Sequence, residues 1–83
     1  MNKKTLPSWS SLATAIVVNG VYEHYKGFRY KVLATARHSE TLEELVVYQA
    51  LYGKEELWVR PLAMFLENIV IDEQLQPRFK LVQ

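Results

Sequence analysis

A histidine, a serine and a glutamate stand side by side at positions 38–40, and these are residue types that hydrolases use. In such enzymes an imidazole takes the proton of the serine hydroxyl while an acid orients the imidazole. Neighbours in an extended segment point to opposite faces, however, and no glycine-rich oxyanion loop surrounds His38, Ser39 and Glu40. Ser39 and Thr41 are better placed to bond their own loop backbone. We assign no catalytic residue and keep a small hydrolase using His38, Ser39 and Glu40 as an alternative.

A metal site would have to use His24 and His38, because the chain has two histidines and no cysteine. A carboxylate such as Glu23 or Glu40 would complete the ligand set. The two histidines belong to different hairpin regions and show no ligand-like spacing, so we expect no metal and no cofactor. The lack of cysteine also excludes disulfides and thiolate nucleophiles, and it favours a reducing compartment, which we take to be the cytoplasm.

Arg60 is the charged residue that is most informative about ligand binding, because it lies close to Trp58 and directly before Pro61. A guanidinium at such a place could bind a phosphate or carboxylate through two hydrogen bonds. A structural ion pair, with a partner such as Glu40 or Glu44, is the favoured interpretation. Arg37 and Arg78 carry the same two interpretations.

Aromatic residues are concentrated in the segments that alternate between apolar and polar positions. By a period of two, Tyr22 and His24 share one face and Tyr25 lies on the other. Small β-barrels bind single-stranded nucleic acid or extended peptides with such rings, while nearby cations meet the backbone charge. The candidate ligand-binding residues are Tyr22, His24, Tyr25, Arg37, His38, Trp58 and Arg60.

The element that best positions these residues is a strand over residues 28–37. Gly27 predicts a tight turn from a preceding strand at residues 21–25, because glycine tolerates positive φ. Within the long strand, alternation places one set of side chains on the core side, while Arg29, Lys31, Thr35 and Arg37 share the other side with Leu33. The core set is Phe28, Tyr30, Val32, Ala34 and Ala36.

The rest of the chain continues in short β segments. An apolar strand at 44–52 follows a connection at 38–43, and a turn at 53–56 leads to a returning strand at 57–60 that Pro61 ends. Residues 62–67 predict a single helical turn, and strands at 68–71 and 78–82 flank a polar loop at 72–77. Five or six short strands with one helical turn predict a small, strongly bent antiparallel β-barrel of SH3 type, because closure removes exposed edges.

Length and composition limit the possible classes of protein. Eighty-three residues, 49% of them hydrophobic, fit one globular domain, which we place at 20–83 after an N-terminal extension at 1–19. A net charge of +1 argues against a dedicated duplex-DNA binder. The apolar run at 12–18 is too short for a signal peptide or a membrane span. A chain this small gains from burying more surface, so a homo-oligomer is a reasonable expectation.

Five blocks of sequence together resemble the bacterial domain of unknown function family 1653. They are Gly20–Gly27, Ala36–Thr41, Leu45–Gly53, Leu57–Leu62 with Met64 and Phe65, and Pro77–Phe79. The resemblance covers about residues 20–82 and implies a small SH3-like barrel, with no activity to transfer. We expect a non-enzymatic module that binds nucleic acid or an extended peptide, because aromatic rings are interleaved with Lys26, Arg29, Arg37 and Arg60 and no catalytic constellation is present. The alternatives are the hydrolase above and an oligomerisation module in which Trp58 and the strand at 44–52 form the interface.

Overall fold

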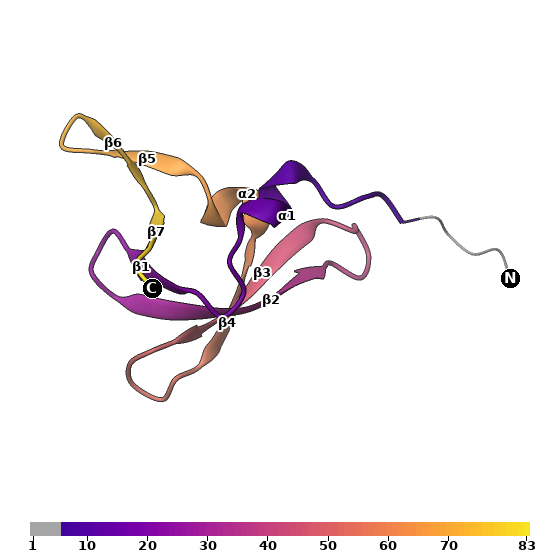
Figure 1. Cartoon of the computed structure of the whole chain (residues 1–83), viewed down its shortest axis with the longest axis horizontal. Coiled ribbons are helices and arrows are strands. Elements are labelled where there is room, and N and C mark those ends of the chain that lie inside the picture. The colour runs from indigo at the N-terminus through magenta and orange to yellow at the C-terminus, as the bar shows by residue number, and fades with distance from the viewer. Residues whose placement is uncertain (1–5) are drawn as a thin grey trace, which may run out of the picture.

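The computed structural model describes residues 6–83 as a mainly β domain with two short helices (Figure 1). The mainly β prediction is confirmed. No helix in the described part is long and apolar enough to cross a membrane. The elements in chain order are α1 (Ser11–Ala15), β1 (Val21–His24), β2 (Arg29–Arg37), β3 (Glu44–Ala50), β4 (Leu57–Pro61), α2 (Leu62–Phe65), β5 (Asn68–Ile71), β6 (Gln74–Pro77) and β7 (Phe79–Leu81).

The strands form an open antiparallel sheet and a separate ribbon. The sheet has the order β4-β3-β2-β1-β7, and β5 pairs only with β6. The predicted closed SH3-like barrel is not found, because β4 and β7 remain as free edges. Closure would require these two edges to meet, but the chain between them forms α2 and a β5–β6 hairpin that projects away from the sheet (Figure 1).

The β5–β6 hairpin replaces the polar loop that was expected over residues 72–77. Ile71 pairs with Gln74, so Asp72 and Glu73 form a two-residue turn. Both have positive φ, 51° and 66°, as a type I′ hairpin turn requires. Neither residue is the glycine or asparagine that usually marks this turn, which explains why the sequence pattern missed it.

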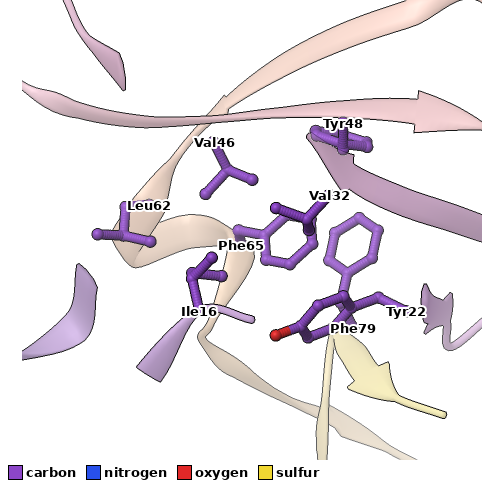
Figure 2. Packing of buried hydrophobic residues seen from close by; sticks show 8 residues of the cluster. All are labelled: Ile16, Tyr22, Val32, Val46, Tyr48, Leu62, Phe65 and Phe79. Atoms are coloured by element: carbon purple, nitrogen blue, oxygen red, sulfur yellow. The ribbon is translucent and has the colours of Figure 1, made fainter. Parts of the chain in front are cut away.

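The core lies on the face of the sheet that α2 covers, here called the inner face. Leu62 and Phe65 of α2 are fully buried there against Val32 and Val46, and the Phe65 ring stacks on Phe79 at 4.1 Å between centroids (Figure 2). Each buried side chain of this size removes roughly 1.5–3 kcal/mol of unfavourable hydration. The remaining members of the cluster are Ile16, Tyr22 and Tyr48.

A β-bulge in β2 changes which side chains face the core. Val32 is opposite Tyr48 but Ala34 is opposite Val47, so Leu33 is an extra residue in the ladder. The extra residue shifts the alternation by one position. The prediction that Ala34 and Ala36 point into the core is therefore wrong: Thr35 shares the inner face with its partner Val46, and Ala34 is exposed.

The described residues of the N-terminal segment pack onto the same domain. Ile16 is only 8% exposed and belongs to the core cluster. The backbone N–H of Val17 donates to the hydroxyl of Tyr22, and that of Asn19 donates to the carbonyl of Val32. The positions from 6 to 19 thus include a short helix, α1, and a buried contact with the sheet, while positions 1–5 lie outside the described residues.

Candidate ligand-binding surface

The strand register brings rings from four parts of the chain into contact with one another. Phe28 and Tyr52 lie 4.9 Å apart between centroids, and Tyr52 contacts Tyr30 at 5.5 Å. Tyr30 contacts Phe79 at 5.8 Å, and Phe79 contacts His24 at 4.9 Å. These contacts form a continuous path of rings that ends at Tyr25, 4.4 Å from His24. Phe79, in the middle of the path, is 4% exposed and belongs to the core, so it joins the two more exposed ends from inside the domain.

Four rings of this region are open to solvent. Tyr25, Phe28, Tyr52 and Trp58 are between 41% and 53% exposed. Trp58 belongs to the inner face, since it pairs with Tyr48 in the sheet. We name these four rings, together with the half-buried His24 and Tyr30, the aromatic surface. Rings held by a sheet offer flat apolar area at low entropic cost.

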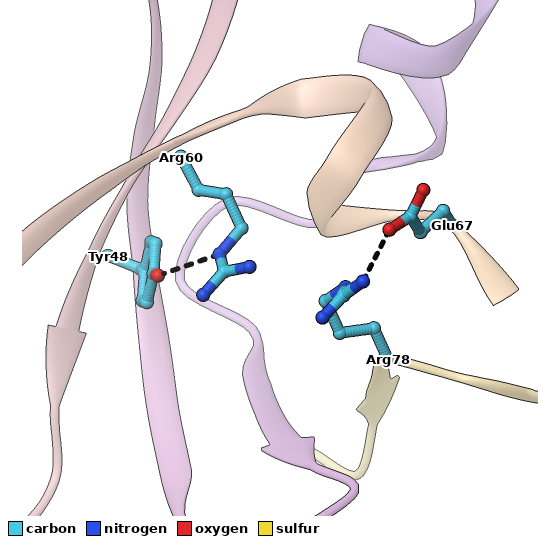
Figure 3. A network of polar contacts seen from close by, with 4 residues as sticks. All are labelled: Tyr48, Arg60, Glu67 and Arg78. Atoms are coloured by element: carbon cyan, nitrogen blue, oxygen red, sulfur yellow. Dashed lines mark hydrogen bonds and ion pairs between the residues drawn. The ribbon is translucent and has the colours of Figure 1, made fainter. Parts of the chain in front are cut away.

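Arg60 adds an unpaired cation to the aromatic surface. Its Nε donates to the Tyr48 hydroxyl at 3.2 Å (Figure 3). Its guanidinium also lies 5.5 Å from the centre of the Phe79 ring. Among residues 6–83 no carboxylate lies within ion-pair distance of Arg60, so the expected pairing with Glu40 or Glu44 is wrong. The Nε bond orients the guanidinium and leaves its terminal nitrogens available to an anion.

The field around His24 is positive. Burial is the largest cause that lowers the pKa of His24 below its ordinary value, and the charges of Arg60, Arg78 and Lys26 lower it further. Arg78 is itself paired with Glu67 (Figure 3). Of the cations that act on His24, Arg60 and Lys26 therefore remain able to attract a ligand's negative charge.

The centre of the aromatic surface is fixed by a tyrosine pair. The hydroxyls of Tyr30 and Tyr52 are 2.7 Å apart. Burial, and then the hydrogen bond to Tyr52, raise the pKa of Tyr30 to about 12, so the Tyr30 hydroxyl stays protonated at neutral pH. The pair connects β2 to the β3–β4 turn and holds two rings in place.

Two hollows flank the aromatic surface. One has a volume of about 180 Å³ at the β3–β4 turn, and Tyr52, Lys54, Glu56 and Trp58 line it. The other has a volume of about 390 Å³ where β6 runs into β7, and its walls include His24, Tyr25, Gln76 and Pro77. Each hollow thus offers an exposed ring with polar groups beside it.

The structure separates the predicted binding residues into three groups. His24, Tyr25, Trp58 and Arg60 contribute to the aromatic surface or its border. Tyr22 does not, because it is 3% exposed and its ring packs edge-on against Phe65 at 5.2 Å, so its placement on the binding surface is corrected to the core. Arg37 and His38 form the third group, in the region of the β2–β3 connection.

Arg37 and His38 are held by local contacts outside the aromatic surface. Arg37 donates to the carbonyl of Pro7 and lies 4.3 Å from the ring centre of Trp9. The Nδ1 of His38 accepts backbone N–H bonds from Glu40 and Thr41. Arg37 therefore secures the N-terminal segment, and His38 orders its own loop.

The arrangement around His38 has none of the contacts of a hydrolytic triad. In the described part of the chain, neither the Ser39 hydroxyl nor the Glu40 carboxylate bonds to the imidazole. Residues 38–40 are all exposed. Within residues 6–83 no three metal-ligating side chains gather at one place.

Sequence reasoning missed three members of the aromatic surface: Phe28, Tyr30 and Tyr52. Alternation assigned Phe28 and Tyr30 to the core, yet Phe28 is 53% exposed and Tyr30 is half-buried. Tyr52 lies in the turn beyond the end of β3, where period-two counting no longer applies. The usable signal was the position of Phe28 directly after a turn glycine, since strand ends are less covered than strand centres.

Comparisons with known proteins give a family model and a solved structure. The model described as "Protein of unknown function (DUF1653)" matches residues 20–81. A crystal structure of a Bordetella bronchiseptica protein, described as belonging to DUF1653, is 41% identical with a TM-score of 0.70. The match covers 77% of this chain and 85% of the Bordetella chain. A comparison with curated proteins found no match.

Proposed function

Because the chain belongs to the DUF1653 family of proteins of unknown function, we propose its role from its own surface: a non-enzymatic module that binds single-stranded nucleic acid. The observation that carries the proposal is the ring path from Phe28 to Tyr25 with the unpaired Arg60 beside it. Unpaired bases stack on exposed rings with little sequence preference, and cations meet the phosphates. We also propose a cytoplasmic location, where ligands of this class occur.

Charge favours a single strand over a duplex. The net charge of +1 leaves few cations to neutralise two phosphate backbones. The exposed rings Tyr25, Phe28, Tyr52 and Trp58 instead need bases that are free to unstack. Affinity would then come mainly from stacking, and its dependence on salt would be modest.

The test is a fluorescence-anisotropy titration of a labelled oligothymidine of about 12 nucleotides, a length within the usual site range of such binders. Binding should weaken as salt rises. Trp58→Ala should raise Kd by roughly 5- to 150-fold, since one stacked base contributes about 1–3 kcal/mol. Arg60→Gln should reduce the salt slope, because it removes one phosphate contact.

Trp9→Ala is the matched control. Trp9 is 44% exposed, close to the 47% of Trp58, but it packs beside Arg37 and outside the ring path. It should leave Kd unchanged. No binding at low salt, or equal losses in the two tryptophan variants, would remove the nucleic-acid proposal. Binding of a proline-rich peptide in place of oligothymidine would instead reassign the rings to extended peptides.

A further inference from the structure

The free edge β4 exposes unpaired backbone groups. Ala50 N–H donates to the carbonyl of Glu56, which places Glu56, and by alternation Trp58 and Arg60, in hydrogen-bonded pairs with β3. The N–H and C=O groups of Leu57 and Val59 therefore point away from the sheet. Such an edge is a template for another strand.

The side chains of β4 do not protect this edge. Leu57 and Val59 are 61% and 59% exposed, and both lie on the outer face of the sheet. Val59 continues an apolar row, since it pairs with Val47, which pairs with Ala34. Protected edges usually carry lysine, a central proline or an inward charge. Here Pro61 stands at the last position of the strand, and the inward charge of β4, Arg60, can be neutralised by an acidic residue of an added strand.

We propose that β4 pairs antiparallel with β4 of a second copy of this chain, about a two-fold axis at Trp58. Leu57 would then lie opposite Val59 of the partner subunit, and the reverse pair would follow by symmetry. These two pairs satisfy all four outward N–H groups of the two strands. On the inner face, Arg60 would lie opposite Glu56 of the partner subunit.

Charge complementarity selects this register. A two-fold axis at Val59 would place Leu57 opposite Pro61 of the partner subunit, which has no N–H to donate. An axis at Leu57 would place Arg60 opposite Lys54 of the partner subunit, a repulsive pair. Of these three registers, only the one centred on Trp58 places opposite charges across from each other, pairs apolar side chains and satisfies every outward backbone N–H group.

The dimer goes beyond the proposed binding function and stands without it. It would join two sheets into one and place Trp58 beside Trp58 of the partner subunit on a shared inner face. If the aromatic surface binds a strand, the dimer would present two such surfaces side by side. If it does not, the edge pairing is unaffected.

Sedimentation equilibrium on the full chain tests association. We expect a monomer–dimer equilibrium, and Glu56→Arg should raise the dimer Kd roughly tenfold or more, because it replaces two attractive cross-strand pairs by two repulsive ones. Glu55→Arg is the control, since it makes the same change of charge one residue away and should leave Kd near its original value. A chain that stays monomeric to about 1 mM overturns the proposal.

Single cysteines test the register in a chain that has none of its own. Trp58→Cys should give a disulfide-linked dimer under mild oxidation. The two residues at position 58 face each other across the axis as a non-hydrogen-bonded pair, whose Cα atoms are about 4.5 Å apart and so within the range of a disulfide. Leu57→Cys and Val59→Cys should cross-link far less. Preferred cross-linking at position 57 or 59 would overturn the proposed pairing.

Discussion

Glu44 shows how one carboxylate can fasten a remote segment to the sheet. The Ser10 backbone N–H donates to Glu44 Oε2 at 2.7 Å, and the Ser10 hydroxyl donates to Oε1. These bonds favour the ionised form and lower the pKa of Glu44 below its ordinary value. Trp9, next to Ser10, also packs against Arg37. The segment before α1 is therefore held through one charge on each of two neighbouring strands.

The hydrogen bonds between Ser10 and the Glu44 carboxylate should weaken in acid. A carboxyl whose pKa is lowered on folding contributes its stabilisation above the unfolded pKa and loses it as pH falls through the folded value. In a ¹H–¹⁵N NMR titration, the Ser10 amide should shift with a midpoint below the ordinary glutamate pKa of about 4.3. Glu44→Gln should abolish this shift, whereas Glu43→Gln should keep it. A Ser10 midpoint at or above the ordinary value would contradict the prediction.

Tyr22 and Trp58 show the limit of reasoning about single residues. Both are aromatic residues within strands, yet Tyr22 is 3% exposed and Trp58 is 47% exposed. They even share the inner face, so alternation cannot separate them. The difference is coverage: Phe65 of α2 lies against Tyr22, while Trp58 stands on an edge strand.

At the scale of elements, the bulge in β2 has the largest effect on the fold. Leu33 is the extra residue, and it lets Tyr30 and Val32 before it, and Thr35 and Arg37 after it, all lie on the inner face. Bulges also increase the local twist of a sheet, which helps it to curve around the core. A regular strand could not place both pairs on one face.

A deletion in β2 and a deletion in the neighbouring strand β3 should therefore behave differently. Removing Leu33 leaves Val32 opposite Tyr48 and Ala34 opposite Val47, so every pairing keeps its face. We expect this variant to fold with a loss of about 0.5–3 kcal/mol in urea unfolding. Removing Val47 from β3, whose pairing with β4 contains no extra residue, moves the side chains on one side of the deletion to the opposite face and should abolish cooperative folding. Equal damage from both deletions would show that Leu33 has a role beyond adding one residue.

At the scale of the whole molecule, the segment before the first strand completes the core. The DUF1653 match begins at residue 20, but Ile16 lies in the hydrophobic cluster and Ala13 packs against it. In a small domain, one buried side chain is a large part of the net stability. The stable folding unit should therefore extend upstream of the matched residues.

Substitutions in α1 and the residue after it test this extension. Ile16→Ala should lower the free energy of unfolding by about 2–5 kcal/mol in urea titration. Leu12→Ala, in the same segment but 42% exposed, should change it by less than about 0.5 kcal/mol. A chain beginning at Gly20 should lose at least as much stability as Ile16→Ala. If that truncated chain keeps its full stability, Ile16 does not belong to the folding unit.

Local pattern in the sequence determined the strands other than β6, the turn at Gly27, a helical turn within residues 62–67 and the family. Each depends on residues close together in the chain, where alternation, glycine and proline act directly. The ligand class and the role of Arg60 did not follow from such patterns, because both depend on which side chains meet across strands.

Tertiary structure decided the open edges, the face of each residue after Leu33 and the composition of the aromatic surface. The path from Phe28 through Tyr52 to Phe79 joins residues from separate strands and turns, and only the pairing of β2 with β3 and of β1 with β7 brings them together. One extra residue moves every later side chain to the opposite face. For that physical reason, the core and the surface of this protein could be separated only by its three-dimensional register.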